Sequence, residues 1–555
     1  MAREKIVGLI EDALGRAVSE GLLSPVEAGT IELERPKRRE HGDWSTNLAL
    51  DVAGRLDMNP REVAVIIAGL IAEDPDVVSK VEVAGPGFIN FHLSLAFIRN
   101  VLFEIEERGL EFGSSDAGGG QQVQVEFVSA NPVGPLHVGH GRWAALGDAL
   151  SSVMSHAGFL VEREFYVNDY GTQLRNFGRS ISARYLELLG RGGEFPGGGY
   201  VGEYIKDIAR RIVDECGDEF LDLPEEERVD TFIDMEYPRM LESIRDTLEG
   251  MGVVFDVWFS ERGLYSRGEV EEAISALERD GKAYREGGAL WLRTTEYGDE
   301  KDRVLVRSSG EPTYFASDIA YHHDKMDRGF DKVIDIWGAD HHGYVTRMKA
   351  AMEAMGYGRE ALEVILGQLV KLFRSGRPVA MSKRTGEIVT LDELLEEVGA
   401  DGARYFFLQR SHDSPLDFDI ELAKQESPEN PVYYVQYAHA RISSILRYAR
   451  EEKADLSEAL PEDLVLLEAE AEMDLLRKLG ELEEVVEFCA LRRVPHRLTG
   501  YAEELATLFH AFYRDCRVVT DDERLMRARV FLVHGVRQVL RIVLGLIGVS
   551  APEQM

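Results

Sequence analysis

Two histidines, His137 and His140, stand three residues apart just after a loop rich in proline and glycine. The β-branched and aromatic run at 123–128 favours a strand, and the apolar residues after the loop recur at helical spacing. The loop therefore delivers both imidazoles to the first turn of a helix, where unpaired N–H groups and the helix dipole favour an anion. Gly139 leaves room for a ring or a phosphate to approach the backbone. The pattern predicts an anion site, although an isolated pair of such histidines is more often a polar cap.

A second set of residues could hold a cation. Tyr314 and Asp318 are four residues apart, so a helix beginning near Thr313 would present both on one side. A planar guanidinium offers paired N–H donors that match carboxylates arranged as a fork. Glu126, at the end of the first strand, and Asp318, near the start of this helix, could form that fork. Taken alone, Asp318 is more often an ordinary charge at a helix N-terminus.

The stretch ANPVGPLHVGH, residues 130–140, resembles the HIGH motif of class I aminoacyl-tRNA synthetases, in the form typical of arginyl-tRNA synthetases. The partner motif of that class is the KMSKS loop, which Met381, Ser382 and Lys383 match, with Ala380 in place of the first lysine. The resemblance implies that the two motifs hold ATP from opposite sides and that Lys383 stabilises charge on the departing pyrophosphate.

The same resemblance assigns further residues to the substrates. It implies that Glu126, Tyr314 and Asp318 hold the arginine side chain and that Ser129 and Asn131 lie near its amino group. For ATP it implies contacts along the motif and at the end of a later strand, namely Pro135, Leu136, Val138, Gly338, Asp340 and His341. A metal site at Asp340, His341 and His342 is not favoured, because adjacent residues rarely converge on one ion.

These groups must be positioned by an open α/β sheet. The strand at 123–128, the helix and a second apolar strand at 159–167 follow one another, which implies parallel strands with a right-handed crossover. Ligands then bind at the carboxyl ends of the strands. A later apolar strand ends at Gly338, and Gln368 with residues 370–373 is expected to form the last strand of this sheet. Residues 289–292 and 304–306 are expected to pair as strands of an insertion.

The predicted organisation is multidomain: a small α+β N-terminal domain at 1–112, a Rossmann-like nucleotide-binding domain with a parallel sheet at 121–395, a connecting segment at 396–426 and an all-α C-terminal bundle at 427–555. The second domain carries an insertion at about 192–310. HGDWSTNLAL and GPGFINFHL resemble the N-terminal domain of arginyl-tRNA synthetases, which implies contact with the tRNA elbow, although His41, Asp43 and Trp44 could equally form a packed loop.

The C-terminal stretch SPENPVYYVQYAHARISSILRYAR resembles the anticodon-binding domain of that family, which implies tRNA contacts at Tyr437 and Arg441. Helical spacing equally suits a core, and most members of this polar and aromatic set are expected to be buried: Tyr433, Tyr434, Gln436, Tyr437, His439 and Arg441.

Composition limits the partners and the compartment. The sequence contains no apolar run of about 18 residues, the length needed to cross a membrane. The acidic amphipathic start is unlike a signal peptide, so a cytoplasmic protein is expected. Three distant cysteines form neither a disulfide framework nor a zinc site, and no zinc is expected. The net charge of −36 argues against a nucleic-acid partner, although the basic stretches 35–39 and 524–529 could supply a local track.

The activity expected from the resemblance is ATP-dependent activation of L-arginine and transfer of the arginyl group to the 3′ end of tRNA(Arg), with Mg²⁺ accompanying ATP and a monomeric enzyme. Three alternatives stay open. A different class I synthetase is disfavoured by the missing zinc cysteines and by the carboxylates Glu126 and Asp318. An inactive RNA-binding relative is disfavoured by the intact motifs. A small-molecule nucleotidyltransferase leaves both flanking domains unexplained.

Overall fold

The computed structural model describes residues 2–27, 29–36, 38–71, 74, 76–192, 195–379, 389–451 and 460–555. These residues fall into two compact units. The first contains Met1–Gly109, Ser444–Glu481 and Leu508–Gln538, and the second contains Leu110–Ser443, Leu482–Thr507 and Val539–Met555. Within the described ranges, no helix is both long enough and apolar enough to span a membrane.

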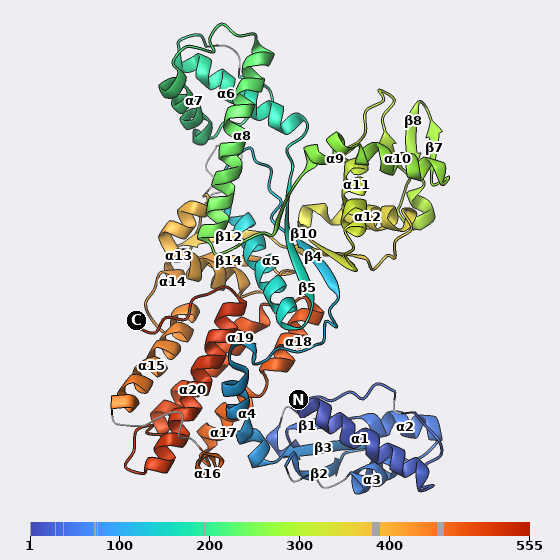
Figure 1. Ribbon diagram of the computed structural model, residues 1–555, viewed down its shortest axis with the longest axis vertical. Helices are drawn as coiled ribbons and strands as arrows, with labels where there is room; N and C mark the ends of the chain where they lie inside the picture. Colours follow the sequence, from blue (N-terminus) through green and yellow to red (C-terminus); the bar gives the residue numbers. More distant parts are fainter. Residues whose placement is uncertain are drawn as a thin grey trace. The chain divides into compact units, whose positions relative to one another are not determined.

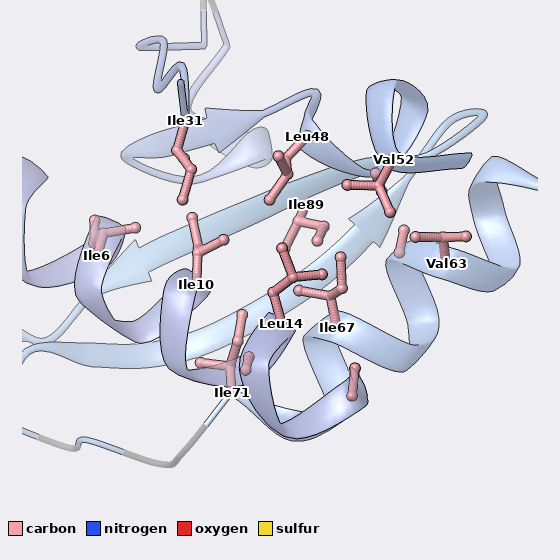
Figure 2. Close-up of a cluster of buried hydrophobic side chains, with 14 of the residues drawn as sticks. Ile6, Ile10, Leu14, Ile31, Leu48, Val52, Val63, Ile67, Ile71 and Ile89 are labelled. Atoms are coloured by element: carbon pink, nitrogen blue, oxygen red, sulfur yellow. The ribbon is translucent and has the colours of Figure 1, made fainter. Parts of the chain in front are cut away.

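The N-terminal part of the first unit is a three-stranded antiparallel sheet covered by helices, in the strand order β1-β3-β2. Its core is built by α1, α2 and α3, whose apolar stripes contribute Ile10, Val52 and Ile67 against Ile89 of β3 (Figure 2). The elements are α1 (Ala2–Ser19), β1 (Trp44–Thr46), α2 (Leu48–Leu56), α3 (Pro60–Leu70), β2 (Val78–Ala84), β3 (Phe88–Leu93) and α4 (Leu95–Arg108). Strands β2 and β3 lie on either side of Gly85, and the predicted α+β domain is confirmed.

The second unit is organised around a five-stranded parallel sheet in the order β11-β10-β4-β5-β6. The chain moves from β4 outward to β5 and β6, then crosses to the other side of β4 with β10 and β11, so the strand order reverses between β4 and β10. Figure 1 shows α5 beside these strands. The elements are β4 (Gln122–Glu126), α5 (Val138–His156), β5 (Leu160–Val167), β6 (Val257–Ser260), α11 (Tyr314–Asp327), β10 (Lys332–Gly338), α12 (His342–Ala354) and β11 (Leu362–Gly367).

Helix α5 packs so closely on the sheet that Gly147 cannot carry a side chain: a Cβ there would lie 2.1 Å from the ring of Phe127. Fourteen residues of α5 are buried, which explains why its sequence is rich in alanine and glycine rather than sharply amphipathic. The parallel Rossmann-like sheet with covering helices is confirmed.

Residues 192–310 do not form one continuous insertion, because β6 within this range belongs to the main sheet. Figure 1 shows α6, α7 and α8 grouped together, and α9 to α12 grouped with β7 and β8. Strand β6, which completes the main sheet, lies between these two groups in chain order. It is short and has charged residues on both sides, so the sequence pattern does not reveal it. The elements of the range and its borders are α6 (Thr172–Leu188), α7 (Glu203–Cys216), α8 (Glu225–Gly250), α9 (Glu261–Arg267), α10 (Glu269–Arg279), β7 (Ala283–Glu286), β8 (Ala289–Leu292) and β9 (Arg303–Val306). The expected pairing of 289–292 with 304–306 is confirmed as β8 with β9.

The prediction that residues 370–373 extend the main sheet is wrong. They form β12, which pairs with β13 and, in parallel, with β14 as a separate sheet. The periodicity of residues 370–373 indicates a strand but does not specify its partner, which is chosen by tertiary packing. The remaining elements are β12 (Val370–Arg374), β13 (Arg377–Pro378), α13 (Leu391–Leu408), β14 (Leu416–Asp419), α14 (Ile420–Ala423), α15 (Pro431–Glu451), α16 (Pro461–Leu464), α17 (Glu470–Leu479), α18 (Leu482–Arg492), α19 (Arg497–Asp515) and α20 (Glu523–Leu546). The C-terminal region is helical, as predicted.

Candidate active site

A cavity of about 880 Å³ opens at the carboxyl ends of β4 and β10. This is the point at which the strand order reverses, where open α/β sheets generally bind their ligands. Its walls come from the segment after β4, the start of α5, one face of α11 and the segment after β10. The lining includes Glu126, Ser129, Asn131, His137, Gly139, His140, Asp318, Gly338, Asp340 and His341.

One end of the cavity is formed by His137 and His140. The backbone N–H of Gly139 donates to Nδ1 of His137 over 3.1 Å, and the backbone N–H of His137 donates to Nδ1 of His140 over 3.2 Å. The two rings stack with their centroids 3.6 Å apart. Because Nδ1 of each ring accepts a hydrogen bond, the neutral tautomer of each carries its proton on Nε2. Two N–H donors therefore stand at the N-terminus of α5, where an anion is favoured.

The other end of the cavity is acidic. Glu126 Oε1 accepts a hydrogen bond from Ser129 Oγ at 2.8 Å, and Glu126 Oε2 accepts one from Lys325 Nζ at 2.5 Å. Asp318 is partly exposed and accepts a hydrogen bond from the hydroxyl of Tyr344. Burial raises the pKa of the Asp318 carboxyl above its usual range, against the effect of Tyr344. A bound cation would offset that burial, so this end favours a positively charged group.

Behind these carboxylates lies Asp335, a fully buried residue of β10. Lys325 Nζ donates to Asp335 Oδ1 at 3.0 Å, and His322 Nε2 lies 2.8 Å from Asp335 Oδ2. The other ring nitrogen of His322 lies 2.7 Å from the backbone carbonyl of Asp318. A carbonyl and a carboxylate can only accept, so both ring nitrogens donate and His322 is an imidazolium. Burial lowers the pKa of His322, but Asp335 more than offsets this and the net shift is upward.

The turn after β4 has an unusual backbone. Val128 has φ +68° and Ser129 has φ +40°, in the left-handed region that β-branched residues rarely adopt. This conformation aims Ser129 Oγ at Glu126, and the N–H of Tyr166 donates to the same Oγ over 3.1 Å. Further along, the Asn131 side chain donates to Gln173 Oε1 over 2.7 Å. The turn thus joins Glu126 to β5 and α6.

Aromatic side chains line the β10 side of the cavity. The ring of Trp337 contacts those of His341 and Tyr344, with centroids 6.2 Å and 6.0 Å apart. Leu369, which is 72% exposed, also lines the cavity. Aromatic and apolar surfaces of this kind suit a flat, partly apolar ring such as an adenine.

The remaining predicted residues do not line this cavity. Tyr314 is 54% exposed at the start of α11, and Leu136 and Val138 are buried behind the histidine turn with Pro135 partly buried beside them. Met381, Ser382 and Lys383 lie outside the described residues.

On α15, Arg441 donates to the Tyr437 hydroxyl over 2.9 Å. Of the six side chains expected to be mostly core, only Gln436 and His439 are buried, while Tyr433, Tyr434, Tyr437 and Arg441 are partly exposed. That expectation is therefore wrong, because one face of α15 at this level is not fully covered.

Sequence reasoning missed five residues of this site: His322, Asp335, Trp337 and Tyr344, which line the cavity, and Lys325 behind them. A signal was present for two of them: Asp318, His322 and Lys325 are spaced by four and three residues and so share one face of α11. Within the described ranges, no group of three or more His, Cys, Asp or Glu side chains is arranged to hold a metal ion.

Comparison with known proteins agrees with this geometry. The family described as "tRNA synthetases class I (R), catalytic domain" matches residues 107–184 and 213–417. The family "Arginyl tRNA synthetase N terminal domain" matches residues 4–93, and the "DALR anticodon binding domain" matches residues 435–555. The sheet, the cavity at its switch point and the catalytic-domain match define a class I aminoacyl-tRNA synthetase.

Full-length relatives show which family of class I synthetases the chain belongs to. The chain is 52% identical to the arginine–tRNA ligase of Carboxydothermus hydrogenoformans, covering 100% of this chain and 99% of that protein. It is 49% identical to the arginine–tRNA ligase of Geobacter sp. strain M21, with 100% of each covered. The solved arginyl-tRNA synthetase of Thermus thermophilus superimposes with a TM-score of 0.76 at 25% identity, over 98% of this chain and 99% of that one. The chain belongs to the arginyl-tRNA synthetase family, whose general reaction is aminoacylation.

Proposed function

We propose that this chain activates L-arginine with ATP to give arginyl-adenylate and then transfers the arginyl group to the 3′ end of tRNA(Arg). The observation that carries the proposal is the opposite chemistry of the two ends of one cavity. Glu126 and Asp318 suit a guanidinium, and the paired Nε2–H groups of His137 and His140 suit phosphate oxygens.

The proposed chemistry has two displacements and needs no covalent protein nucleophile. The arginine carboxylate attacks the α-phosphorus of ATP and pyrophosphate leaves; a terminal ribose hydroxyl of the tRNA then attacks the arginyl carbonyl and AMP leaves. His137, His140 and the backbone at Gly139 stabilise the phosphates, and positioning lowers the barrier. Mg²⁺ is proposed to arrive with ATP, because Mg²⁺ is usually held through substrate phosphates rather than a protein cage.

Other contacts are proposed from the family resemblance. Ser129 and Asn131 would face the amino group of arginine, and Tyr314 would cover its side chain. Nucleotide contacts are proposed at Pro135, Leu136, Val138, Gly338, Asp340 and His341, and tRNA contacts at Tyr437 and Arg441. The domain limits 1–112, 121–395, 396–426 and 427–555, a monomeric state, a cytoplasmic location and the lack of a zinc requirement belong to the same proposal.

The motif at Met381, Ser382 and Lys383 is proposed to hold ATP from the side opposite the histidine motif. Thr390, seven residues after Lys383, forms an antiparallel bridge with His137, so the chain leaving the motif meets the histidine turn. A charged donor of this kind supplies roughly 3 kcal/mol to the transition state, so Lys383→Ala should slow aminoacylation by about 100-fold to 1,000-fold.

The decisive experiment charges bulk tRNA with ATP and Mg²⁺, comparing arginine with lysine, glutamate and cysteine, for the wild type and Lys383→Ala. Charging with arginine alone, together with a crippled variant, is the expected result. A loss below about threefold at saturating ATP would remove Lys383 from its assigned role. If no amino acid is charged while tRNA still binds, the protein is an inactive RNA-binding member of the family.

A further inference from the structure

Lys325, in the last turn of α11, is a lysine with no exposed surface at all. Its ammonium donates to Glu126 Oε2 at 2.5 Å and to Asp335 Oδ1 at 3.0 Å, and it lies 4.3 Å from the ring centroid of Tyr321. Lysine is almost never fully buried unless it is paired, because removing an ammonium from water is costly. Here one buried ammonium joins a carboxylate of the cavity wall to a carboxylate behind it.

The charged groups around this ammonium carry a net negative charge. Three carboxylates, those of Glu126, Asp318 and Asp335, face two cations, Lys325 and the imidazolium of His322. One unit of negative charge is therefore left in the cluster. Two neighbouring carboxyls do not alter this balance below about pH 7. Arg328 donates to both oxygens of Glu164 at 2.6 Å and 3.1 Å, and burial raises the pKa of Glu261 to about 7.

We propose that Lys325 is a positioning residue for amino-acid recognition: it holds the Glu126 carboxylate in place and, with His322, limits the excess charge of the pocket to one unit, which matches a side chain carrying one positive charge. This inference rests on the proposed function, in which Glu126 and Asp318 receive the guanidinium of arginine. Lys325 itself touches no substrate, since Glu126 and Asp335 stand between it and the cavity.

The physical consequence of removing the ammonium follows from the distances. Glu126 and Asp335 both lie within hydrogen-bond reach of the same Nζ atom, so without it two buried carboxylates face each other. Two carboxylates this close share a proton rather than both staying ionised. Glu126 would then turn toward Asp335 and no longer present an ionised oxygen to the guanidinium, so arginine binding should weaken while ATP binding should not.

The test compares Lys325→Met, which keeps the length of the side chain and removes its charge, with Lys332→Met, the same change at a lysine of β10 that pairs with Glu363 at 3.0 Å and does not line the cavity. Steady-state aminoacylation with bulk tRNA gives KM for arginine and for ATP separately. For Lys325→Met we expect KM for arginine to rise about 30-fold, with KM for ATP and kcat at saturating arginine changed less than threefold. For Lys332→Met we expect KM for arginine to change less than threefold.

A double variant, Lys325→Met with Asp335→Asn, keeps the net charge of the cluster and so protects the fold if the single variant does not accumulate. It still leaves Glu126 without its ammonium, so KM for arginine should stay at least tenfold above the wild-type value. Recovery of the wild-type KM in the double variant, or equal rises in KM for arginine and ATP in the single variant, would overturn the positioning role. A wild-type enzyme that charges no tRNA would instead overturn the proposed function, and the role of Lys325 with it.

Discussion

The two ends of the cavity hold their functional groups by different means. At the histidine end, each imidazole accepts a hydrogen bond from a backbone N–H of its own turn, which links His137, Gly139 and His140. At the acidic end, Glu126 of β4 is fixed by Lys325 of α11, and Asp318 of α11 by Tyr344 of α12. The first arrangement depends on a few consecutive residues, and the second depends on three separate elements meeting in the fold.

The difference has a physical reason. A neutral imidazole costs little to bury in part, and a backbone amide that lacks a helical partner is already present at a helix N-terminus. A carboxylate in a buried wall needs a cation or several donors, and these must come from elsewhere in the chain. Substitutions at the histidine end should therefore affect one group at a time, whereas those at the acidic end should spread to its neighbours.

The largest effect is expected for Asp318→Asn. The amide keeps the shape of the side chain and can still accept from the Tyr344 hydroxyl, but it removes the excess negative charge of the cluster. Loss of one partner of a buried charge pair costs about 2–5 kcal/mol, so kcat/KM for arginine should fall by about 1,000-fold. KM for ATP should change less than threefold, as measured by aminoacylation with each substrate varied in turn.

The control is Asp324→Asn on the same helix, where the carboxylate pairs with Arg328 rather than facing the cavity. It should leave kcat/KM for arginine within threefold of the wild-type value. A loss of less than tenfold in Asp318→Asn would mean that the acidic end does not recognise the charge of the substrate.

The contrast between the two ends also explains what the sequence could predict. The histidine turn was predictable because its geometry is set by neighbouring residues: strand, turn residues and helical periodicity all lie within residues 122–156. The fork of Glu126 and Asp318 was predictable only as a pair of residue types, and Asp318 needed the family resemblance.

The spacing of Asp318, His322 and Lys325 places them on one face of a helix, but the partners of these residues on other elements could not be predicted from local pattern. Lys325 and Glu126 are 199 residues apart in sequence, and nothing near either residue encodes their meeting. The left-handed backbone of Val128 opposes the ordinary preference of a β-branched residue, so propensity argues against the observed turn. The separate sheet of β12 and β14 was missed for the same reason, since partner strands are chosen by tertiary packing rather than by periodicity.

A smaller effect is expected at the histidine end. His140→Ala removes one Nε2–H donor from the proposed phosphate site and should lower kcat by about 100-fold, with KM for arginine changed less than threefold. His140→Asn separates the two roles of the ring, because its amide oxygen can still accept from the His137 N–H. The asparagine variant should keep the wild-type Tm in thermal unfolding yet lose most of the rate. Full activity in His140→Asn would show that the ring serves only as a cap.

The smallest effect concerns Glu261, a carboxyl beside the acidic end. Among the residues that the structure describes, no cation forms an ion pair with Glu261, whereas Lys325 pairs with Glu126. Glu261 is the first residue of α9 and 2% exposed, and its Oε2 has no hydrogen-bond partner among the described residues. Burial raises the pKa of Glu261 to about 7, and the carboxylates of Asp318 and Asp169 act in the same direction. The folded protein therefore holds a proton that the unfolded chain releases near pH 4.5.

This difference makes the folded state lose stability as pH rises. The contribution of Glu261 is fully present below about pH 4.5 and is lost as pH rises through about 7, because only the folded state still binds the proton in that window. Glu261→Gln is neutral at every pH, so it should match the wild type at pH 5 and become more stable than it by about 2 kcal/mol at pH 8. Tm measured across this range gives the difference directly, with the exposed Glu272→Gln on α10 as the control. If the difference in Tm between Glu261→Gln and the wild type does not grow with pH, the buried carboxyl of Glu261 is already ionised. A cation is then not what keeps carboxylates charged at this end of the cavity.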